Sequence, residues 1–308
     1  MQSWKLVAGL VAAMSLLGTA CSGTQGVTEA AETTETAPVT EATETTAATA
    51  TAEAEQILTI GNPDRLSNDV PTVLITGSNR GIGLEFVKQY ADRGWNIIAT
   101  ARNPAEATDL QALATDNERI VIEQLDVTDA ERISDLTNKY GDRPIDILIN
   151  NAGITPKYGS AFKTVSGVDW NMAIRSVEVN AIAPVRISQA FMGQVAASEQ
   201  KKIVVISSKA GSFELSPEMP MMYSYRGSKA ALNMYMYTLS FETPKKEVIL
   251  TLLSPGSVRT FDLPGGIKPP DMIEVDESVS KMLKVIDGLT AEDNGKFLGY
   301  ESGELINW

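Results

Sequence analysis

Tyr225 and Lys229 are the two side chains in this sequence that are best suited to transfer a proton. They lie four positions apart, so on a helix both project from the same face. The chain contains no histidine and a single cysteine, Cys21, which excludes Ser-His-Asp and Cys-His catalysis and an internal disulfide. The same counts argue against a metal site. An ammonium group beside Tyr225 is expected to lower the pKa of the phenol from its usual value of ~10.

A glycine-rich turn is the second feature with chemical meaning. It follows an apolar run and opens a helical pattern, so the helix would direct free N–H groups and the positive end of its dipole at an anion. Its three glycines suit a tight turn, a close approach of the backbone to a pyrophosphate, and close helix–strand packing. The turn therefore predicts a dinucleotide site. Its residues are Gly77, Ser78, Asn79, Arg80, Gly81, Ile82 and Gly83.

Short apolar runs alternate with helical patterns from Val70 onward. This alternation predicts an α/β fold, with one Rossmann-like, doubly wound parallel sheet covered by helices on both faces. We expect that single domain to occupy residues 57–308, with no internal repeat. Strands are expected at 72–76, 96–100, 120–122, 145–149, 203–206, 248–253 and 296–298, and helices at 82–93, 105–114, 130–140, 168–197, 225–241 and 277–289.

The order of the motifs over residues 70–308 resembles the classical short-chain dehydrogenase/reductase family. The glycine turn has that family's Gly-x-x-x-Gly-x-Gly spacing, Asn150-Asn151-Ala152-Gly153 ends the fourth strand, and Ser207-Ser208 ends the fifth. The Tyr-x-x-x-Lys pair and a Pro-Gly turn follow in the expected order. The long segment before Tyr225, the sequence around Tyr225 and the closing Trp308 look like the C-signal and sniffer-type carbonyl reductases.

The resemblance implies a catalytic set of Asn180, Ser208, Tyr225 and Lys229. Tyr225 would be the general acid or base, Ser208 would hydrogen-bond the substrate oxygen, Lys229 would bind the nicotinamide ribose, and Asn180 would hold a water. Besides the glycine turn, Tyr225 and Lys229, the implied cofactor-binding residues are Arg102, Asp126, Val127, Asn151, Ala152, Gly153, Pro255, Gly256, Val258 and Thr260.

The end of the second expected strand indicates which nicotinamide cofactor is preferred. Proteins that bind NAD place a carboxylate there for the ribose 2′-hydroxyl, but here the strand ends in Ala99-Thr100-Ala101-Arg102. Arg102 and Arg80 supply two guanidinium groups that suit a 2′-phosphate. NADP(H) is therefore favoured, and NAD(H) is the alternative.

The expected partners follow from the family resemblance and from the net charge of the chain. The substrate is expected to be a small carbonyl or alcohol, contacted by Ser212, Phe213, the segment 214–222 and the Pro- and Gly-rich segment 261–272, which could act as a lid. A homodimer or homotetramer is expected through the helices that carry Asn180 and Tyr225. The net charge of −13 argues against nucleic-acid binding.

The first 21 residues resemble a bacterial lipoprotein signal peptide. Lys5 precedes the apolar run 6–17, and small residues come before Cys21, although Gly18 stands where a lipobox usually has leucine. Lipid on Cys21 would be the only membrane contact and would hold the protein in the bacterial cell envelope, outside the cytoplasm. Plain secretion is one alternative, and a start-site artefact that leaves the protein cytoplasmic is another. Residues 22–56, rich in Thr, Ala and Glu, are expected to form a disordered linker.

Two classes of function fit these features. The first is an NADPH-dependent oxidoreductase that reduces a small aldehyde or ketone to an alcohol. The alternative is a signalling or sensor protein that keeps the fold and binds the cofactor with little turnover, because reduced nicotinamide is made in the cytoplasm. The presence of both Tyr225 and Lys229 favours the enzyme.

Overall fold

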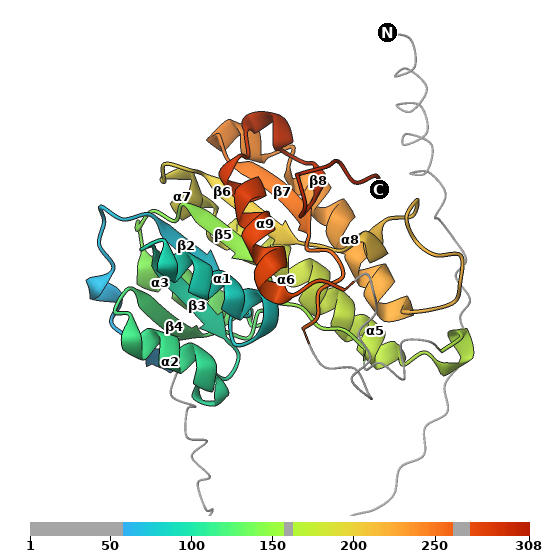
Figure 1. Cartoon of the computed structure of the whole chain (residues 1–308), viewed down its shortest axis with the longest axis horizontal. Coiled ribbons are helices and arrows are strands. Elements are labelled where there is room, and N and C mark those ends of the chain that lie inside the picture. The colour runs from blue at the N-terminus through green and yellow to red at the C-terminus, as the bar shows by residue number, and fades with distance from the viewer. Residues whose placement is uncertain (1–57, 157–162, 261–271) are drawn as a thin grey trace, which may run out of the picture. The chain divides into compact units, whose positions relative to one another are not determined.

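The computed structural model describes residues 58–156, 163–260 and 272–308, and these contain one eight-stranded sheet (Figure 1). The strand order is β1-β4-β3-β2-β5-β6-β7-β8, in which every neighbouring pair is parallel except β1 with β4. This confirms the predicted Rossmann-like, doubly wound sheet. The strands are β1 (Thr59–Ile60), β2 (Thr72–Ile75), β3 (Asn96–Ala101), β4 (Ile120–Gln124), β5 (Ile147–Asn150), β6 (Lys202–Ile206), β7 (Ile249–Ser254) and β8 (Phe297–Gly299).

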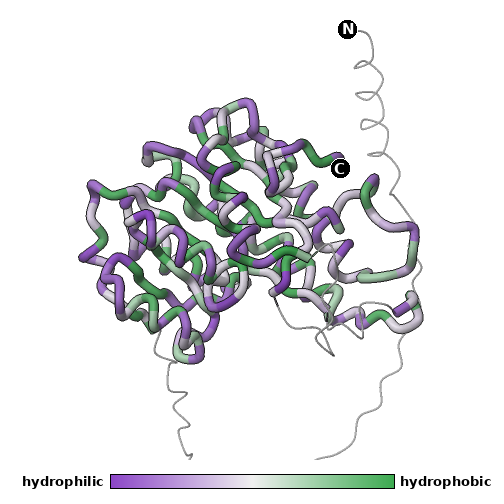
Figure 2. Tube along the Cα trace, in the orientation of Figure 1, coloured by the Kyte–Doolittle hydropathy of each residue, from purple (hydrophilic) through white to green (hydrophobic). Residues whose placement is uncertain are grey.

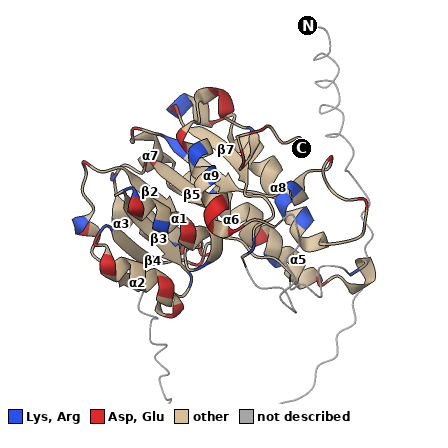
Figure 3. Cartoon of the chain, viewed as in Figure 1, with Lys and Arg blue, Asp and Glu red and all other residues tan. Residues whose placement is uncertain are grey.

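Helices cover both faces of the sheet, because each central strand buries residues on two sides. In β2, Leu74 packs into one hydrophobic cluster while Val73 and Ile75 pack into the other. Figure 2 shows the hydrophobic residues gathered in these strands, and Figure 3 shows charged residues mainly on the helices and connecting loops. The helices are α1 (Gly81–Asp92), α2 (Thr108–Asp116), α3 (Ala130–Tyr140), α5 (Trp170–Val177), α6 (Ala183–Ala190), α7 (Met192–Ala196), α8 (Tyr223–Leu239) and α9 (Val275–Asp287).

The structure differs from the expected elements in two places. The continuous helix expected over 168–197 is wrong: α5 leads into a π-helical segment, Glu178–Ile182, and then into α6 and α7. The π-helical segment widens the helix by one residue and so changes which side chains face the sheet. The short antiparallel strand β1 was not predicted at all.

A buried carboxylate, Glu123, holds β1 against β4. The hydroxyl of Thr59 in β1 donates a hydrogen bond of 2.9 Å to Glu123, whose side chain is fully buried. Lys139 and Arg132 form ion pairs with the same carboxylate at 2.6 and 3.2 Å, and the hydroxyl of Tyr140 donates to it at 2.9 Å. A buried charge needs such partners to offset its lost hydration. This cluster therefore fixes one edge of the sheet.

The expected signal peptide (1–21) and the whole expected linker (22–56) lie outside the described residues, which begin at residue 58. Within the described ranges, no helix is both long and apolar enough to cross a bilayer. The described residues belong to one compact unit, Ala54–Trp308.

Candidate active site

The candidate site lies at the carboxyl ends of β2 and β5, where the strand order reverses direction. Strands β3 and β4 extend the sheet to one side of β2, whereas β6 and β7 extend it beyond β5. In an open α/β sheet this reversal leaves a crevice above the strand ends. The glycine turn follows β2, and Asn151-Ala152-Gly153 follows β5, so the topology brings the two motifs together.

Hydrogen bonds lock these two motifs to each other. The side-chain amide of Asn151 donates to the carbonyl oxygens of Thr76 and Gly77 at 2.9 and 3.0 Å. The hydroxyl of Thr76 accepts from the backbone N–H groups of Asn151 and Ala152 at 3.0 and 3.1 Å. Gly77 has a φ of 69°, and a Cβ there would lie only 2.8 Å from the Cα of Ala152. The contact accounts for glycine at this position.

The remainder of the turn forms an open cradle at the N-terminus of α1. Gly81 has a φ of 56° and lies beside Thr260, and a Cβ on Gly83 would collide with the carbonyl oxygen of Gly77 at 2.2 Å. The first N–H groups of a helix have no carbonyl partner inside the helix, so they can bind an anion. Ser78 is buried and holds the turn through a 2.9 Å hydrogen bond to the carbonyl of Ile75. This cradle fits the pyrophosphate of a dinucleotide.

Two arginines and an aspartate mark one end of the crevice. Arg80 and Arg102 are both exposed, and Arg102 lies close enough to Asp126 to act on its charge. Burial raises the pKa of Asp126, but hydrogen bonds from Thr128 and the positive charges of Arg175 and Arg102 outweigh it and hold that pKa below its ordinary value. Asp126 is therefore ionised at neutral pH.

Asn180 lies in the π-helical segment and is almost fully buried. Its side-chain oxygen accepts from the N–H of Ile154 at 2.7 Å, and its amide donates to the Ile154 carbonyl and to the hydroxyl of Ser228, both at 2.9 Å. Ser228 in turn donates to the carbonyl of Tyr225 at 2.8 Å. These bonds connect the end of β5 with α8.

Ser208 follows β6 and Tyr225 lies in the first turn of α8. The Ser208 hydroxyl lies close enough to the phenol of Tyr225 to act on its pKa. The neighbouring Ser207 is instead buried and donates to the side-chain oxygen of Asn233 at 2.5 Å. Of the two adjacent serines, the structure therefore directs Ser208 toward Tyr225, as expected.

Lys229 lies one turn after Tyr225 on α8, and its Nζ is 5.9 Å from the centre of the Tyr225 ring. The ammonium group donates to the carbonyl oxygen of Ile206 at 2.8 Å. Burial lowers the pKa of Lys229 to about 8. Burial also raises the pKa of Tyr225, an effect that the neighbouring Ser208 hydroxyl offsets only in part.

The expectation of a lowered Tyr225 pKa is therefore wrong for the protein alone. Removing the phenol from water disfavours the phenolate, and that effect exceeds the effect of its neighbours. Tyr225 keeps its proton at neutral pH, which suits a group that donates a proton.

The expected turn after β7 also reaches this edge. Gly256 has a φ of 83° and lies directly against the ring of Tyr300, while the carbonyl of Pro255 accepts a hydrogen bond from Ser278 at 2.7 Å. Val258 forms a parallel bridge with Ile273. The remaining expected cofactor-binding residues also follow the sheet strands. Asn79 and Ile82 lie in the glycine turn after β2, Val127 follows β4, and Gly153 follows β5 beside Asn180. Most of the expected lid, 261–271, lies outside the described residues.

Sequence reasoning missed three supporting side chains. The Thr76 hydroxyl ties the glycine turn to the Asn151 turn, and Ser228 links Asn180 to α8. The side-chain oxygen of Asn233 accepts the hydrogen bond of the Ser207 hydroxyl. All three lie within or beside the glycine turn and the helix of Tyr225, but the partners that give them these roles are distant in the sequence.

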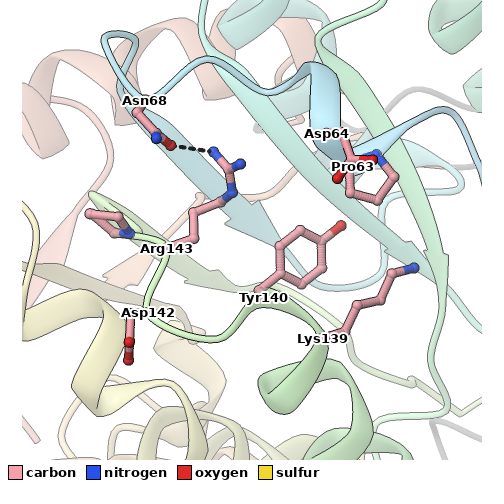
Figure 4. A pocket seen from close by; sticks show the side chains of 8 residues that line it. Pro63, Asp64, Asn68, Lys139, Tyr140, Asp142 and Arg143 are labelled. Atoms are coloured by element: carbon pink, nitrogen blue, oxygen red, sulfur yellow. Dashed lines mark hydrogen bonds between the residues drawn. The ribbon is translucent and has the colours of Figure 1, made fainter.

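A pocket of about 500 Å³ lies away from all of these residues (Figure 4). It lies near the amino ends of β2 and β5, where Arg143 donates to Asn68 at 3.1 Å. Ligands in open α/β sheets bind at the opposite, carboxyl edge. The pocket therefore does not belong to the candidate site. Its lining residues are Pro63, Asp64, Asn68, Lys139, Tyr140, Asp142, Arg143 and Pro144.

Comparison with known proteins agrees with this geometry. An uncharacterized oxidoreductase of Schizosaccharomyces pombe is 33% identical over 244 residues, covering 74% of this chain and 94% of its own. The C-signal of Myxococcus xanthus is 33% identical over 162 residues, covering 53% of this chain and 92% of its own. The structure of an NADPH-bound carbonyl reductase from chicken fatty liver has a TM-score of 0.70 and 35% identity, covering 78% of this chain and 99% of that one.

The expected similarity to carbonyl reductases and to C-signal is thus confirmed, and relatives named as oxidoreductases identify the chain as an enzyme. Residues 71–263 match the family described as short chain dehydrogenase. This chain belongs to the short-chain dehydrogenase family.

Proposed function

We propose that this enzyme uses NADPH to reduce a small aldehyde or ketone to an alcohol. The observation that carries the proposal is the buried Lys229, whose Nζ lies 5.9 Å from the centre of the Tyr225 ring, with Ser208 close enough to act on the same phenol. This group stands next to a cradle for a dinucleotide, so an acid and a hydride source can act on one carbonyl. No feature of the described residues favours the alternative of a sensor without turnover.

NADP(H) is proposed over NAD(H) on two grounds. Arg102, directly after β3, and Arg80, in the glycine turn, are both exposed, and β3 ends without a carboxylate that would repel a 2′-phosphate. The chicken carbonyl reductase, 35% identical to this chain, was solved with NADPH bound. In this proposal the glycine turn holds the pyrophosphate, and Asp126 and Val127 contact the adenine.

The chemistry is proposed to proceed as follows at the substrate oxygen. When bound, the reduced nicotinamide supplies the hydride for the carbonyl carbon. Ser208 donates a hydrogen bond to the carbonyl oxygen and stabilises its developing negative charge. Tyr225 transfers its phenolic proton to that oxygen, which completes the alcohol. The Lys229 ammonium, close to the ring, stabilises the phenolate that remains, and Asn180 positions the water that returns a proton.

The assembly and location are part of the same proposal. Helices α5 and α8 pack together and expose Trp170, Ile174 and Met234, large apolar side chains that a second copy of the chain would cover in a dimer or tetramer. The lipid anchor at Cys21 and the envelope location remain proposals from the leader sequence.

Titration of the purified full chain with NADPH and with NADH tests the cofactor, and loss of NADPH absorbance with a series of small aldehydes and ketones tests the reaction. Tighter binding of NADPH with turnover of at least one carbonyl is the expected result. Binding without turnover of any carbonyl would refute the reductase, and equal binding of both cofactors would refute the NADP(H) preference.

A further inference from the structure

The segment Phe213–Met222 joins the two expected catalytic residues, since it begins after Ser208 and ends before Tyr225. In Figure 1 it is the long gold loop beside α8. It carries several exposed apolar side chains, among them Phe213, which is 85% exposed. This segment is expected from the sequence to contact the substrate, and its position in the chain between Ser208 and Tyr225 agrees with that, so its anchoring bears on substrate binding.

One end of the segment is held by α8. The guanidinium of Arg226, the residue after Tyr225, donates to the carbonyl of Met219 at 3.1 Å. The N–H of Arg226 donates to the carbonyl of Met222 at 2.8 Å, and Met222 itself has a φ of 52°. This end is therefore fixed by the helix that carries Tyr225.

The other end is held by Asn307 and Trp308, residues remote in sequence. The side-chain amide of Asn307 donates to the Glu214 carboxylate at 3.0 Å, and the N–H of Glu214 donates to the carbonyl of Trp308 at 3.4 Å. In Figure 1 the end marked C lies close to the start of the gold loop. This pair gives the segment Phe213–Met222 a second anchor.

Aromatic packing fixes Trp308 in turn. Its ring stacks on the fully buried Phe297 of β8, with centres 5.6 Å apart and an interplanar angle of 24°. The centre of the Trp308 ring also lies 5.5 Å from the centre of the Tyr237 ring in α8. The N–H of Ile306 donates to the carbonyl of Phe297 at 2.7 Å, so the backbone before Asn307 is tied to β8 as well. The anchor is therefore packed against β8 and α8, with the Trp308 side chain still 40% exposed.

We propose that Asn307 and Trp308 are positioning residues for substrate binding, because they hold the segment Phe213–Met222 in place beside Ser208 and Tyr225. The inference rests on the proposed reductase function. Without the anchor, the segment samples other arrangements, and only the anchored fraction binds the carbonyl well. If that fraction falls to a tenth, the KM for the carbonyl rises about tenfold, while the Kd for NADPH is unchanged.

Trp308→Ala in the full chain tests this, with Trp308→Phe as the conservative variant. Leu305→Ala is the matched control, because Leu305 lies three residues before Trp308 but its side chain is 65% exposed. The first measurement is hydrogen exchange at the amide of Glu214, with the amide of Arg226 as the internal reference. The second is KM, kcat and the Kd for NADPH.

In Trp308→Ala, Glu214 is expected to exchange faster and the KM for the carbonyl to rise about tenfold, with kcat, the NADPH Kd and exchange at Arg226 unchanged. Trp308→Phe is expected to restore the wild-type values, and Leu305→Ala to keep them. Unchanged exchange at Glu214, or faster exchange with an unchanged KM, would overturn the inference. If the wild type itself reduces no carbonyl, the proposed function fails, and the role in substrate binding fails with it, even where exchange at Glu214 increases.

Discussion

Replacing Lys229 by methionine is expected to stabilise the cofactor-free protein at neutral pH while removing its turnover. Lys229 is only 6% exposed, and burial lowers its pKa from 10.5 to about 8. The difference is 10.5 − 8, about 2.5 pH units, and at 1.36 kcal/mol for each unit it corresponds to about 3 kcal/mol of destabilisation when the group is charged. The variant loses the hydrogen bond to Ile206, a loss of about 1 kcal/mol. The expected net gain is about 2 kcal/mol.

The difference in unfolding free energy between the wild type and Lys229→Met depends on pH. Below pH 8 the amine is protonated in both the folded and the unfolded chain, so the full destabilisation is present. Between about pH 8 and 10.5 the unfolded chain binds more protons than the folded one, so the stability of the wild type rises with pH. Above that window the destabilisation is gone. The advantage of Lys229→Met should therefore disappear there.

Urea unfolding of the wild type and Lys229→Met at pH 7, 9 and 10.5 measures this difference, since other groups titrate equally in both proteins. Lys209→Met is the control, because Lys209 is exposed on the neighbouring turn and its replacement should change little at any pH. A variant less stable than the wild type at pH 7 would refute the reasoning. So would a difference in unfolding free energy that is the same at all three pH values.

The other expected outcomes concern catalysis, cofactor, location and assembly. Tyr225→Phe should lower turnover by at least ~10²-fold while the Kd for NADPH, followed by fluorescence, stays near the wild-type value; retained turnover would show that another group donates the proton. Arg102→Ala should weaken NADPH roughly tenfold or more and NADH little, because it removes a charged hydrogen-bond donor to the 2′-phosphate; equal weakening of both would contradict that contact. Cys21→Ser should move the protein from the membrane fraction of the producing cell to the aqueous fraction, and an unchanged distribution would rule out the lipid anchor. Ile174→Glu should lower the mass measured by light scattering in solution, whereas an unchanged mass would exclude α5 from the interface.

The central strands and several helices could be predicted because their causes are local. The helix expected at 130–140 forms with those bounds, since Asp129 caps its first turn with a hydrogen bond to the N–H of Arg132 and Gly141 ends it with a positive φ. The buried strands could be predicted because strands covered on both faces have near-continuous apolar sequences, which solvent-exposed segments do not have. The glycine turn could be predicted because part of its cause is local: Gly77 and Gly81 have positive φ values, and Gly83 lies against the carbonyl oxygen of Gly77.

The features that could not be predicted depend on distant partners. The π-helical segment around Asn180 has no compositional signature, and its stabilising bonds run to Ile154 and to Ser228, far away in the sequence. The raised pKa of Tyr225 comes from burial by the folded chain, whereas the spacing to Lys229 suggested the opposite direction. Strand β1 is only two residues long and pairs through β4, so no periodic pattern could reveal it.

That short strand determines where the domain can be cut. A fragment that starts at Val70, where the alternating apolar pattern begins, would lack β1 and leave the backbone of β4 as an open sheet edge. Open edges pair with other chains and aggregate. The cut would also remove the Thr59 hydroxyl from the buried Glu123 carboxylate. A soluble fragment should therefore begin before Leu58. Residue 58 enters the fold at the β1 edge of the sheet, whereas Trp308 stacks on β8 at the opposite edge and anchors the segment Phe213–Met222 there.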